Sequence, residues 1–282
     1  MIALLGTGLL GSGFARALRA KGEPLRVWNR TPAKAQVLAE AGAVPVSDPS
    51  EAVRGAERVH LVLSDDAAVD AVLATAARGL SPGTLLVDHT TTSTAGARAR
   101  TASWRERGFT YVHAPVFMGP QNAADSTGLM LVSGERDVVA RVSPLLAPLT
   151  GELIDLGPRV DAAAAFKLLG NLLLMTLNGG LTDMLALGRA MGVEPQQVAG
   201  LLAHFNPGAS LPGRLQRLLA ADYANPSWEL AMARKDARLM QAEADGAGVR
   251  LTLLPAFAAL MERHLAEGLG RADWTVVARD FV

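Results

Sequence analysis

The sequence predicts an α/β fold in two parts: a doubly wound sheet in residues 1–158, and an all-α part in residues 159–282. Two observations carry this division. Up to Gly157-Pro158, short apolar runs with strand character alternate with Ala-rich segments of helical periodicity, which is typical of a largely parallel sheet covered by helices. Beyond that point the sequence contains no convincing strand, and its periodicity predicts helices only.

The individual elements follow from these patterns. Strands are predicted at residues 2–5, 25–28, 58–63, 84–88, 110–112, 129–132 and 152–156, with helical segments such as 66–77 and 94–107 between them. In the second part, helices are predicted at 161–190, 194–203, 211–221, 226–245 and 253–267, whereas 273–282 fits no clear pattern. The helix at 161–190, about 45 Å long, is predicted to join the two domains.

A glycine-rich turn follows the first predicted strand and opens an Ala- and Leu-rich helix. Its spacing matches the turn that binds the pyrophosphate of a dinucleotide in Rossmann-type folds: Gly6 permits the tight turn, Gly8 lets the backbone approach the phosphates, and Gly11 lets the helix pack closely on the strand. An ordinary glycine-rich turn is the alternative. Amide groups at the helix start would point at the phosphates. The predicted cofactor-binding residues of this turn are Gly6, Thr7, Gly8, Leu9, Leu10 and Gly11.

The residues after the second strand indicate which dinucleotide binds. An NAD site usually has Asp or Glu here for the ribose hydroxyl, whereas an NADP site offers Arg to the 2′-phosphate. This sequence has Asn29, Arg30 and Thr31, and a guanidinium can bind a phosphate through two hydrogen bonds. NADP(H) is therefore predicted over NAD(H); the alternative is that Arg30 is a solvated charge and Thr31 only a helix cap. Two residues at the end of the next long strand complete the predicted cofactor site, Ser64 and Asp65.

Composition excludes several kinds of chemistry. The chain has 282 residues, no cysteine and a formal net charge of +0. It therefore has no disulfide, thiol catalysis or Cys-ligated metal, and its five histidines lack ligand spacing, so no metal site is predicted. A neutral chain gives no support to binding of nucleic acid or an anionic membrane. The start lacks the basic region of a signal peptide, and the apolar run 168–177 is too short to span a membrane, so a cytoplasmic protein is expected.

A polar stripe runs along the otherwise apolar helix 161–190. Lys167 and Asn171 are four residues apart and share a face of the helix. Asn178 and Thr182, further along the helix, lie on or near the same face. A buried lysine is costly unless it is paired or faces a polar cleft, and burial lowers its pKa, which suits it to proton transfer. The alternative is that Lys167 reaches the surface along its aliphatic stem and Asn171 only bonds to backbone.

Five segments along nearly the whole chain resemble the β-hydroxyacid dehydrogenases, the family of 3-hydroxyisobutyrate dehydrogenase, tartronate semialdehyde reductase and glyoxylate/succinic semialdehyde reductases. Residues 5–11 are similar to that family's opening motif, and residues 88–91 (Asp-His-Thr-Thr) to its Asp-x-Ser-Thr segment. Residues 114–119 (Ala-Pro-Val-Phe-Met-Gly) are similar to Ala-Pro-Val-Ser-Gly-Gly. Residues 157–171, with the lysine and asparagine of the stripe, are similar to Gly-x(n)-Lys-x-x-Asn-Asn, and residues 235–236 to Lys-Asp-Leu.

The resemblance implies roles for these residues. Lys167 would donate a proton to the carbonyl oxygen as hydride arrives, and Asn171 would orient the substrate. Thr91 would lie near the nicotinamide, and Lys235 would reach the cofactor, although a simple exposed charge is the alternative for Lys235. Thr90 replaces the family's serine, keeps its hydroxyl and is predicted to bind substrate.

Two departures from the family pattern concern the substrate. Phe117 and Met118 stand where the family has the Ser and Gly that bind the substrate carboxylate, so apolar bulk replaces a hydroxyl, while Gly119 is kept. Backbone amides at 117–119 could still bind an oxyanion, but a larger or less polar substrate becomes plausible. Gly170 stands where the family commonly has its first Asn. The predicted substrate-binding residues are Thr90, Phe117, Met118, Gly119, Lys167 and Asn171.

Together these observations predict an NADPH-dependent oxidoreductase that interconverts an aldehyde or keto acid and its hydroxyacid, with Lys167 as proton donor. The main alternative is an imine (C=N) reductase; imine reductases share the fold and a similar Trp-Asn-Arg-Thr segment, but usually carry Asp or Tyr at the position of Lys167. A third possibility is a non-catalytic NADP-binding module that acts through protein contacts. The apolar surface of helix 161–190 and the resemblance predict a homodimer or homotetramer. The only other expected partner is a small carbonyl or hydroxyacid substrate.

Overall fold

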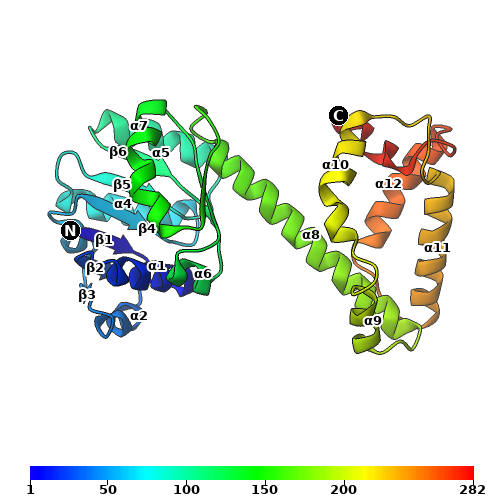
Figure 1. Cartoon of the computed structure of the whole chain (residues 1–282), viewed down its shortest axis with the longest axis horizontal. Coiled ribbons are helices and arrows are strands. Elements are labelled where there is room, and N and C mark those ends of the chain that lie inside the picture. The colour runs from blue at the N-terminus through cyan, green and yellow to red at the C-terminus, as the bar shows by residue number, and fades with distance from the viewer. The chain divides into compact units, whose positions relative to one another are not determined.

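A six-stranded parallel sheet forms the framework of the first part of the chain. In the computed structural model, which describes all residues from 1 to 282, the strand order is β3-β2-β1-β4-β5-β6 (Figure 1). The order reverses between β1 and β4, which is where ligands of doubly wound sheets bind. The predicted fold class is confirmed. The strands are β1 (Ile2–Leu5), β2 (Leu25–Trp28), β3 (Val44–Pro45), β4 (Arg58–Leu61), β5 (Leu85–Asp88) and β6 (Thr110–His113).

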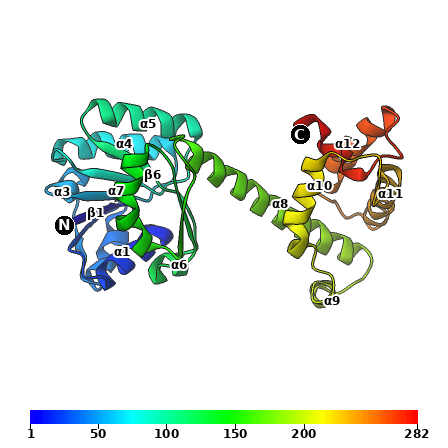
Figure 2. The ribbon, with the colours of Figure 1, turned by 45° about the horizontal axis from the view of Figure 1, so that its top comes forward.

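Helices cover both faces of this sheet (Figure 2). Leu4 of β1 packs in the same core as Phe14 on one face, whereas its neighbour Leu5 packs with Leu73 on the other. Burial on both faces explains why the strands are nearly continuous apolar runs rather than alternating ones. The helices of this part are α1 (Leu9–Ala20), α2 (Pro32–Gln36), α3 (Pro49–Val53), α4 (Asp66–Ala76), α5 (Thr94–Glu106), α6 (Pro120–Asp125) and α7 (Arg136–Leu146).

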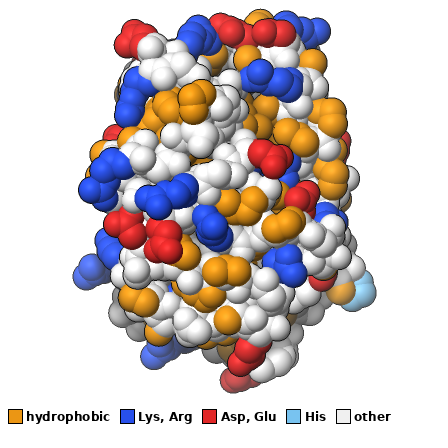
Figure 3. Space-filling model, turned by 90° about the vertical axis from the view of Figure 1, so that its left-hand side faces the viewer, with side chains coloured by type: hydrophobic (Ala, Val, Ile, Leu, Met, Phe, Trp, Pro, Cys, Tyr) orange, Lys and Arg blue, Asp and Glu red, His pale blue; other side chains and the backbone are white.

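The surface of this part carries charges of both signs. On the face shown in Figure 3, Lys and Arg side chains are interspersed with Asp and Glu, with apolar side chains between them. This mixture agrees with the formal net charge of +0 for the whole chain. Neither sign therefore dominates this face.

A second, three-stranded sheet follows the first, made of β7 (Val116–Phe117), β8 (Leu129–Val132) and β9 (Glu152–Asp155). β7 is antiparallel to β8, and β8 is parallel to β9. The strands predicted at 129–132 and 152–156 therefore exist but lie outside the six-stranded sheet. The sequence did not predict β3 and β7, because two residues are too few to show a strand period.

The chain divides into two compact units, Met1–Asn171 and Leu172–Val282, and α8 (Ala162–Ala190) contributes residues to both. The second unit is helical, apart from an isolated bridge between Glu229 and Asp273. The segment at the C-terminus, which fits no clear sequence pattern, is a 3₁₀ helix (Trp274–Phe281). The expected domain boundary between residues 158 and 159 stays a prediction. The other helices are α9 (Pro195–Leu201), α10 (Leu211–Ala220), α11 (Leu230–Gly246) and α12 (Leu254–Ala266).

Many apolar side chains of α8 are exposed, among them Leu172 at 62 % and Met175 at 71 %. The run 168–177 is too short for a bilayer, but the complete helix is long and apolar enough to cross one by length and composition. Only 17 % of its most apolar stretch is buried. Most of the apolar surface of α8 is therefore uncovered in the single chain.

Two carboxylates anchor turns of the second unit. Asp183 on α8 accepts hydrogen bonds from the backbone N–H groups of residues 252–254, at the start of α12. Burial raises the pKa of Asp183, but these donors outweigh it and hold the pKa below its usual value. Asp273 accepts hydrogen bonds from the N–H and hydroxyl groups of both Ser227 and Thr275. Burial raises its pKa as well, yet the donors bring the pKa to about 2.

Candidate active site

A cavity of about 600 Å³ lies at the carboxyl ends of β1, β2 and β4. No Asp or Glu lines it, whereas two cations do: Arg30 and Lys34. Lys34 was not among the residues predicted from the sequence, although its place four residues after Arg30, in the short helix α2, indicates that both cations lie on one side. The cavity brings together six residues predicted to bind the cofactor: Gly6, Gly8, Asn29, Arg30, Thr31 and Ser64.

The glycine turn has the geometry of a phosphate cradle. Gly6 has φ +102°, and a Cβ there would overlap the carbonyl oxygen of Val62. A Cβ on Gly11 would overlap the carbonyl oxygen of Gly6, so close packing of α1 on the turn requires glycine. Gly8 differs, because a Cβ there would meet nothing within 4 Å and no side chain caps α1. The first N–H groups of α1 therefore have no side-chain cap, and an uncapped helix start suits an anion such as a pyrophosphate.

Asn29 ties this turn to the end of β2. Its Oδ1 accepts a hydrogen bond from the Thr7 N–H at 3.0 Å, and its Nδ2 donates to the Thr31 carbonyl oxygen at 2.9 Å. Arg30 and Thr31 are exposed, and the Thr31 side chain makes no capping bond to α2. Thr31 therefore keeps a free hydroxyl at the cavity.

Four residues predicted to bind the cofactor through the glycine turn do not line this cavity: Thr7, Leu9, Leu10 and Gly11. Gly11 serves the packing of α1, and the side chains of the other three differ. The Thr7 hydroxyl is buried without a hydrogen-bond partner. Leu9 is 82 % exposed, whereas Leu10 packs against the core. Leu9 is therefore the one of these residues that exposes most of its side chain, whereas the Thr7 N–H is already bonded to Asn29.

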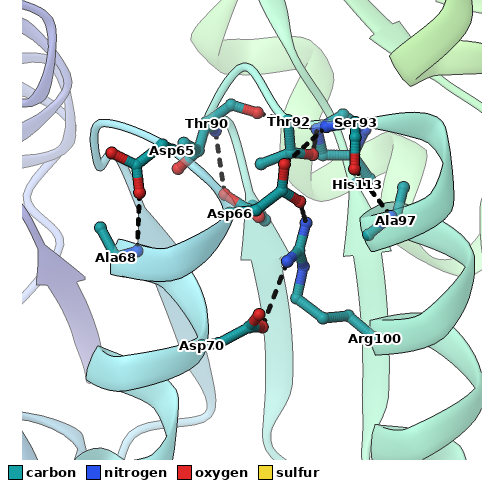
Figure 4. Close-up of polar contacts among 12 residues, drawn as sticks. Asp65, Asp66, Ala68, Asp70, Thr90, Thr92, Ser93, Ala97, Arg100 and His113 are labelled. Carbon is teal, nitrogen blue, oxygen red and sulfur yellow. Dashed lines mark hydrogen bonds and ion pairs between the residues drawn. The ribbon is translucent and has the colours of Figure 1, made fainter.

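Ser64 and Asp65 follow β4 and serve different purposes. The Ser64 hydroxyl donates to the Asp65 carboxylate at 2.9 Å. That carboxylate accepts the Ala68 N–H at 2.8 Å (Figure 4). Hydrogen bonds from Ala68 and Ser64 lower the pKa of Asp65. Asp65 is thus a helix cap of α4, and only Ser64 lines the cavity.

Thr90 and Thr91 follow β5. The Thr90 hydroxyl is buried and accepts the Leu63 N–H at 3.0 Å, so it joins the ends of β4 and β5. Its N–H donates to Asp88 at 2.9 Å. Thr90 is therefore fully engaged within the protein, while Thr91 beside it is exposed and outside the lining of the cavity.

A polar network that the sequence did not reveal, buried at Arg100, Tyr111 and Asp88, supports these strand ends (Figure 4). Arg100 of α5 donates to Asp66 at 2.5 Å and Asp70 at 3.1 Å on α4, and to the Tyr111 hydroxyl at 3.0 Å. Tyr111 in turn donates to Asp88 at 2.6 Å. Burial and the Asp88 charge hold the pKa of Tyr111 well above its ordinary value. The network links both helices to the segment that carries Thr90 and Thr91.

The histidines near the strand ends are part of the core. His60 Nδ1 and His89 Nε2 lie 2.9 Å apart, and His89 Nδ1 lies 2.6 Å from the Ala114 carbonyl oxygen. Phe14 stacks on His89 at 4.7 Å between ring centroids. Burial lowers the pKa of His60 and His113 and brings that of His89 to about 4. These neutral rings are poor proton donors.

Lys167 is the buried cation of the first unit that lacks an anionic partner. It is 9 % exposed, and its Nζ donates to Asn171 Oδ1 at 2.9 Å. The same Nζ lies 4.2 Å from the centre of the Phe117 ring. Burial lowers the pKa of Lys167 below its ordinary value of 10.5. An ammonium with a lowered pKa, held beside an amide, can donate a proton to a substrate oxygen.

The rest of the polar stripe behaves differently. Asn178 and Thr182 are exposed and donate to carbonyl oxygens of their own helix. Lys235, on α11 in the second unit, pairs with Asp236 at 2.8 Å. Its assignment to the cofactor stays a prediction.

The segment 117–119 is largely committed to internal contacts. The Phe117 ring occupies the space beside Gly170, where a Cβ would lie 2.6 Å from its Cε1 atom. Met118 packs against the core and over Gly128. The Gly119 N–H donates to Asn122 Oδ1 at 2.9 Å, so this amide is already occupied.

Both parts of the chain match known dehydrogenase domains. Residues 1–157 match the NAD-binding domain of 6-phosphogluconate dehydrogenase, and residues 162–280 match the NAD-binding domain of NADP-dependent 3-hydroxyisobutyrate dehydrogenase. The chain is 28 % identical to a 3-sulfolactaldehyde reductase of Escherichia coli, over 98 % of this chain and 94 % of that protein.

Solved structures share the whole fold. An imine reductase from Myxococcus stipitatus in complex with NADP⁺ has a TM-score of 0.92 and 22 % identity, over 99 % of both chains. A reductive aminase from Aspergillus terreus in complex with NADPH and ethyl levulinate has a TM-score of 0.90 and 26 % identity, over 100 % of this chain and 99 % of that one. The glycine cradle, its cavity and these matches over the full length lead to one assignment: the chain belongs to the β-hydroxyacid dehydrogenase family of NAD(P)-binding oxidoreductases.

Proposed function

We propose that the protein is an NADPH-dependent oxidoreductase that interconverts an aldehyde or keto acid and its hydroxyacid. The observation that carries this proposal is Lys167, a buried ammonium without an anionic partner, hydrogen-bonded to Asn171 on the same helix face. A buried charge of this kind is costly for stability, and a perturbed pKa at such a position is typical of a functional group.

The chemistry divides between the cofactor and the protein. The nicotinamide, when bound, supplies or accepts the hydride at the carbonyl carbon. Lys167 gives its proton to the carbonyl oxygen, and the lowered pKa makes that transfer easier. Asn171 holds the Lys167 Nζ through Oδ1, which leaves its Nδ2 group to orient the substrate. Thr91 is proposed to lie near the nicotinamide, held there by the bonds of Thr90 to Leu63 and Asp88.

The residues around the cavity fit a dinucleotide and favour NADP(H). The free N–H groups at the start of α1 suit the pyrophosphate, while Arg30, Lys34 and the free hydroxyl of Thr31 suit a 2′-phosphate. No carboxylate lines the cavity to bond a ribose 2′-hydroxyl. We expect Arg30→Ala to weaken NADPH binding by about 10- to 100-fold and to leave NADH binding nearly unchanged. Equal losses for both cofactors in a fluorescence titration would contradict the assignment.

The function is tested by NADPH oxidation with glyoxylate, succinic semialdehyde, tartronate semialdehyde, bulkier keto acids and cyclic imines, with NADH run in parallel. Turnover of a carbonyl compound that disappears in Lys167→Ala supports the proposal. Turnover that survives in this variant excludes Lys167 as the proton donor.

An imine reductase is the second candidate. Phe117 and Met118 replace the polar carboxylate-binding residues that the family carries at these positions, which favours a less polar substrate, and a reductive aminase is among the proteins of similar structure. Turnover of cyclic imines with no activity on any carbonyl would select this alternative. Tight NADPH binding without turnover of either class would instead support a non-catalytic binding module.

We further propose a cytoplasmic homodimer or homotetramer, with residues 1–158 as cofactor domain and 159–282 as the domain for substrate and assembly. The exposed leucines and methionine of α8 motivate this, because monomeric proteins rarely expose so long an apolar surface. We attribute that surface to self-association, rather than to a bilayer or a nucleic acid. Light scattering on the purified protein tests it, and a monomer that needs no detergent would contradict it.

A further inference from the structure

Phe117 and Gly170 form a size-matched pair in the first unit. A Cβ on Gly170 would lie 2.6 Å from Phe117 Cε1 and closer still to Cζ. No L side chain fits at position 170 while the ring stays in place. The sequence departs from the family pattern at 117 and at 170, and these two departures are coupled. The Phe117 ring occupies the space that a side chain at position 170 would fill.

The ring also touches the proposed proton donor. The Lys167 Nζ lies 4.2 Å from the ring centre, and the ring is only half-buried. A carbonyl oxygen within hydrogen-bond reach of Nζ brings its substituents to this ring. Whatever is bonded to the reacting carbon therefore meets an aromatic surface rather than a hydroxyl.

Two donors that could hold a carboxylate at segment 117–119 are gone. Position 117 has no hydroxyl, and the Gly119 N–H is bonded to Asn122, while the Met118 side chain lies on the core. Lys167 and Asn171 are engaged by the carbonyl in the proposed reaction. A carboxylate pressed against the ring would lose hydration and gain neither of the two donors at 117–119, which is costly, whereas an apolar group gains from the same contact.

We infer that the Phe117–Gly170 pair sets the substrate class: the group next to the reacting carbon is uncharged and apolar, not a carboxylate. This inference rests on the proposed function, since it places the reacting carbon beside Lys167. Among aldehydes and keto acids, it excludes 2-keto acids as good substrates and favours carbonyl compounds with an alkyl or aryl neighbour.

Steady-state kinetics with an isosteric pair test the inference. Pyruvate and 3-methyl-2-butanone have the same heavy-atom skeleton, but one carries a carboxylate where the other carries an isopropyl group. We expect kcat/KM with NADPH to be at least about tenfold higher for the ketone. In Phe117→Ser/Gly170→Asn, which restores the residues usual in the family, the ratio should shift toward pyruvate by about 10- to 100-fold. A preference of the wild type for pyruvate, or no shift of the ratio in the double variant, overturns the inference.

Coupling between the two positions is tested separately. Gly170→Ala alone should lower activity on the ketone by about tenfold or more, because the methyl group displaces the ring. Adding Phe117→Leu should restore most of that loss, since leucine keeps an apolar wall without the ring. If the losses of activity from Gly170→Ala and Phe117→Leu simply add, the absence of a side chain at position 170 does not serve to make room for the Phe117 ring. Phe281→Ser, at an 83 % exposed position, is the matched control for loss of a phenyl group, and thermal melts identify variants that fail to fold.

A binding experiment separates failure of the inference from failure of the proposed function. Isobutyramide and oxamate, which share an amide carbonyl and differ only in an isopropyl or a carboxylate neighbour, are titrated into the NADP⁺-loaded protein by calorimetry, so no turnover is needed. We expect isobutyramide to bind at least about tenfold more tightly, in the wild type and in Lys167→Ala alike, and the double variant to reverse this order. Equal or tighter binding of oxamate to the wild type, or no binding of isobutyramide, overturns the inference. Retained turnover in Lys167→Ala overturns only the role of Lys167.

Discussion

The two buried charges of α8 have opposite surroundings. Lys167, in the first unit, has one neutral amide and an aromatic ring beside its ammonium. Asp183, in the second unit, accepts three backbone N–H groups. Each has a lowered pKa, yet a lowered pKa means opposite things: the charged form of Lys167 is disfavoured, while that of Asp183 is favoured.

The difference separates a group that we propose to act in catalysis from a group that holds a turn of the fold in place. A carboxylate that accepts several hydrogen bonds stabilises the fold and stays ionised at neutral pH. A charge that burial disfavours and no counter-ion satisfies is poised to lose its proton. Burial alone, which is 9 % exposure for both residues, does not distinguish them.

The variant Lys167→Ala has the largest expected effect and tests this comparison most strongly. We expect kcat to fall by about 10²- to 10⁴-fold, because the proton donor to the carbonyl oxygen is lost. NADPH affinity should change little, and so should thermal stability, since the cost of burying the ammonium offsets the packing that its aliphatic stem provides. Stopped-flow or steady-state kinetics on the active substrate measure the effect. Arg189→Ala, an exposed cation on the same helix, should leave kcat unchanged.

The next effect is on the pH profile. Because Lys167 must carry its proton, the rate of carbonyl reduction should fall about tenfold for each pH unit above its pKa. That pKa lies below 10.5, so the alkaline limb of kcat should begin below the value of an ordinary lysine. In Lys167→Ala the limb should disappear. A limb that survives in this variant would belong to another group.

Asp183→Asn tests the carboxylate that holds the turn before α12 in place. The amide cannot accept all three N–H bonds as strongly, so we expect a loss of about 1–3 kcal/mol in the free energy of unfolding. The second unit should melt at lower temperature, while NADPH binding by the intact first unit is retained. Differential scanning calorimetry measures the loss. Asp245→Asn, an exposed carboxylate on α11, should stay within about 0.5 kcal/mol of the wild type.

The sequence indicated the first of these charges and not the second, for a physical reason. Lys167 and Asn171 are four residues apart on a helix, so their contact is a local property. Asp183 bonds to residues about 70 positions away, and nothing in the local pattern reveals that turn. The glycine cradle could be predicted for the same reason as Lys167, because turn, strand and helix are contiguous in the chain.

The contacts around the proposed substrate site could not be predicted from local sequence patterns either. The exchanges at 117 and 170 were visible one at a time, but only the fold places the Phe117 ring against Gly170. Likewise, the Gly119 N–H donates to Asn122, although the sequence alone suggested that this N–H could bind an oxyanion. The Arg100 network joins segments from residues 66 to 111 and has no sequence signature.

Acid stability offers the finest test of the comparison, at Asp273. Its pKa is about 2 in the folded protein, against about 3.9 when unfolded. A depressed carboxylate pKa adds stability that is present above the unfolded value and is lost as pH falls through the folded one. We therefore expect about 2 kcal/mol of stability in the second unit to disappear between about pH 4 and pH 2. Asp273→Asn should be less stable at pH 7 and lose less of its stability on acidification, as followed by denaturant unfolding at each pH. An unchanged acid profile in the variant would show that the hydrogen bonds of Ser227 and Thr275 are satisfied without the charge.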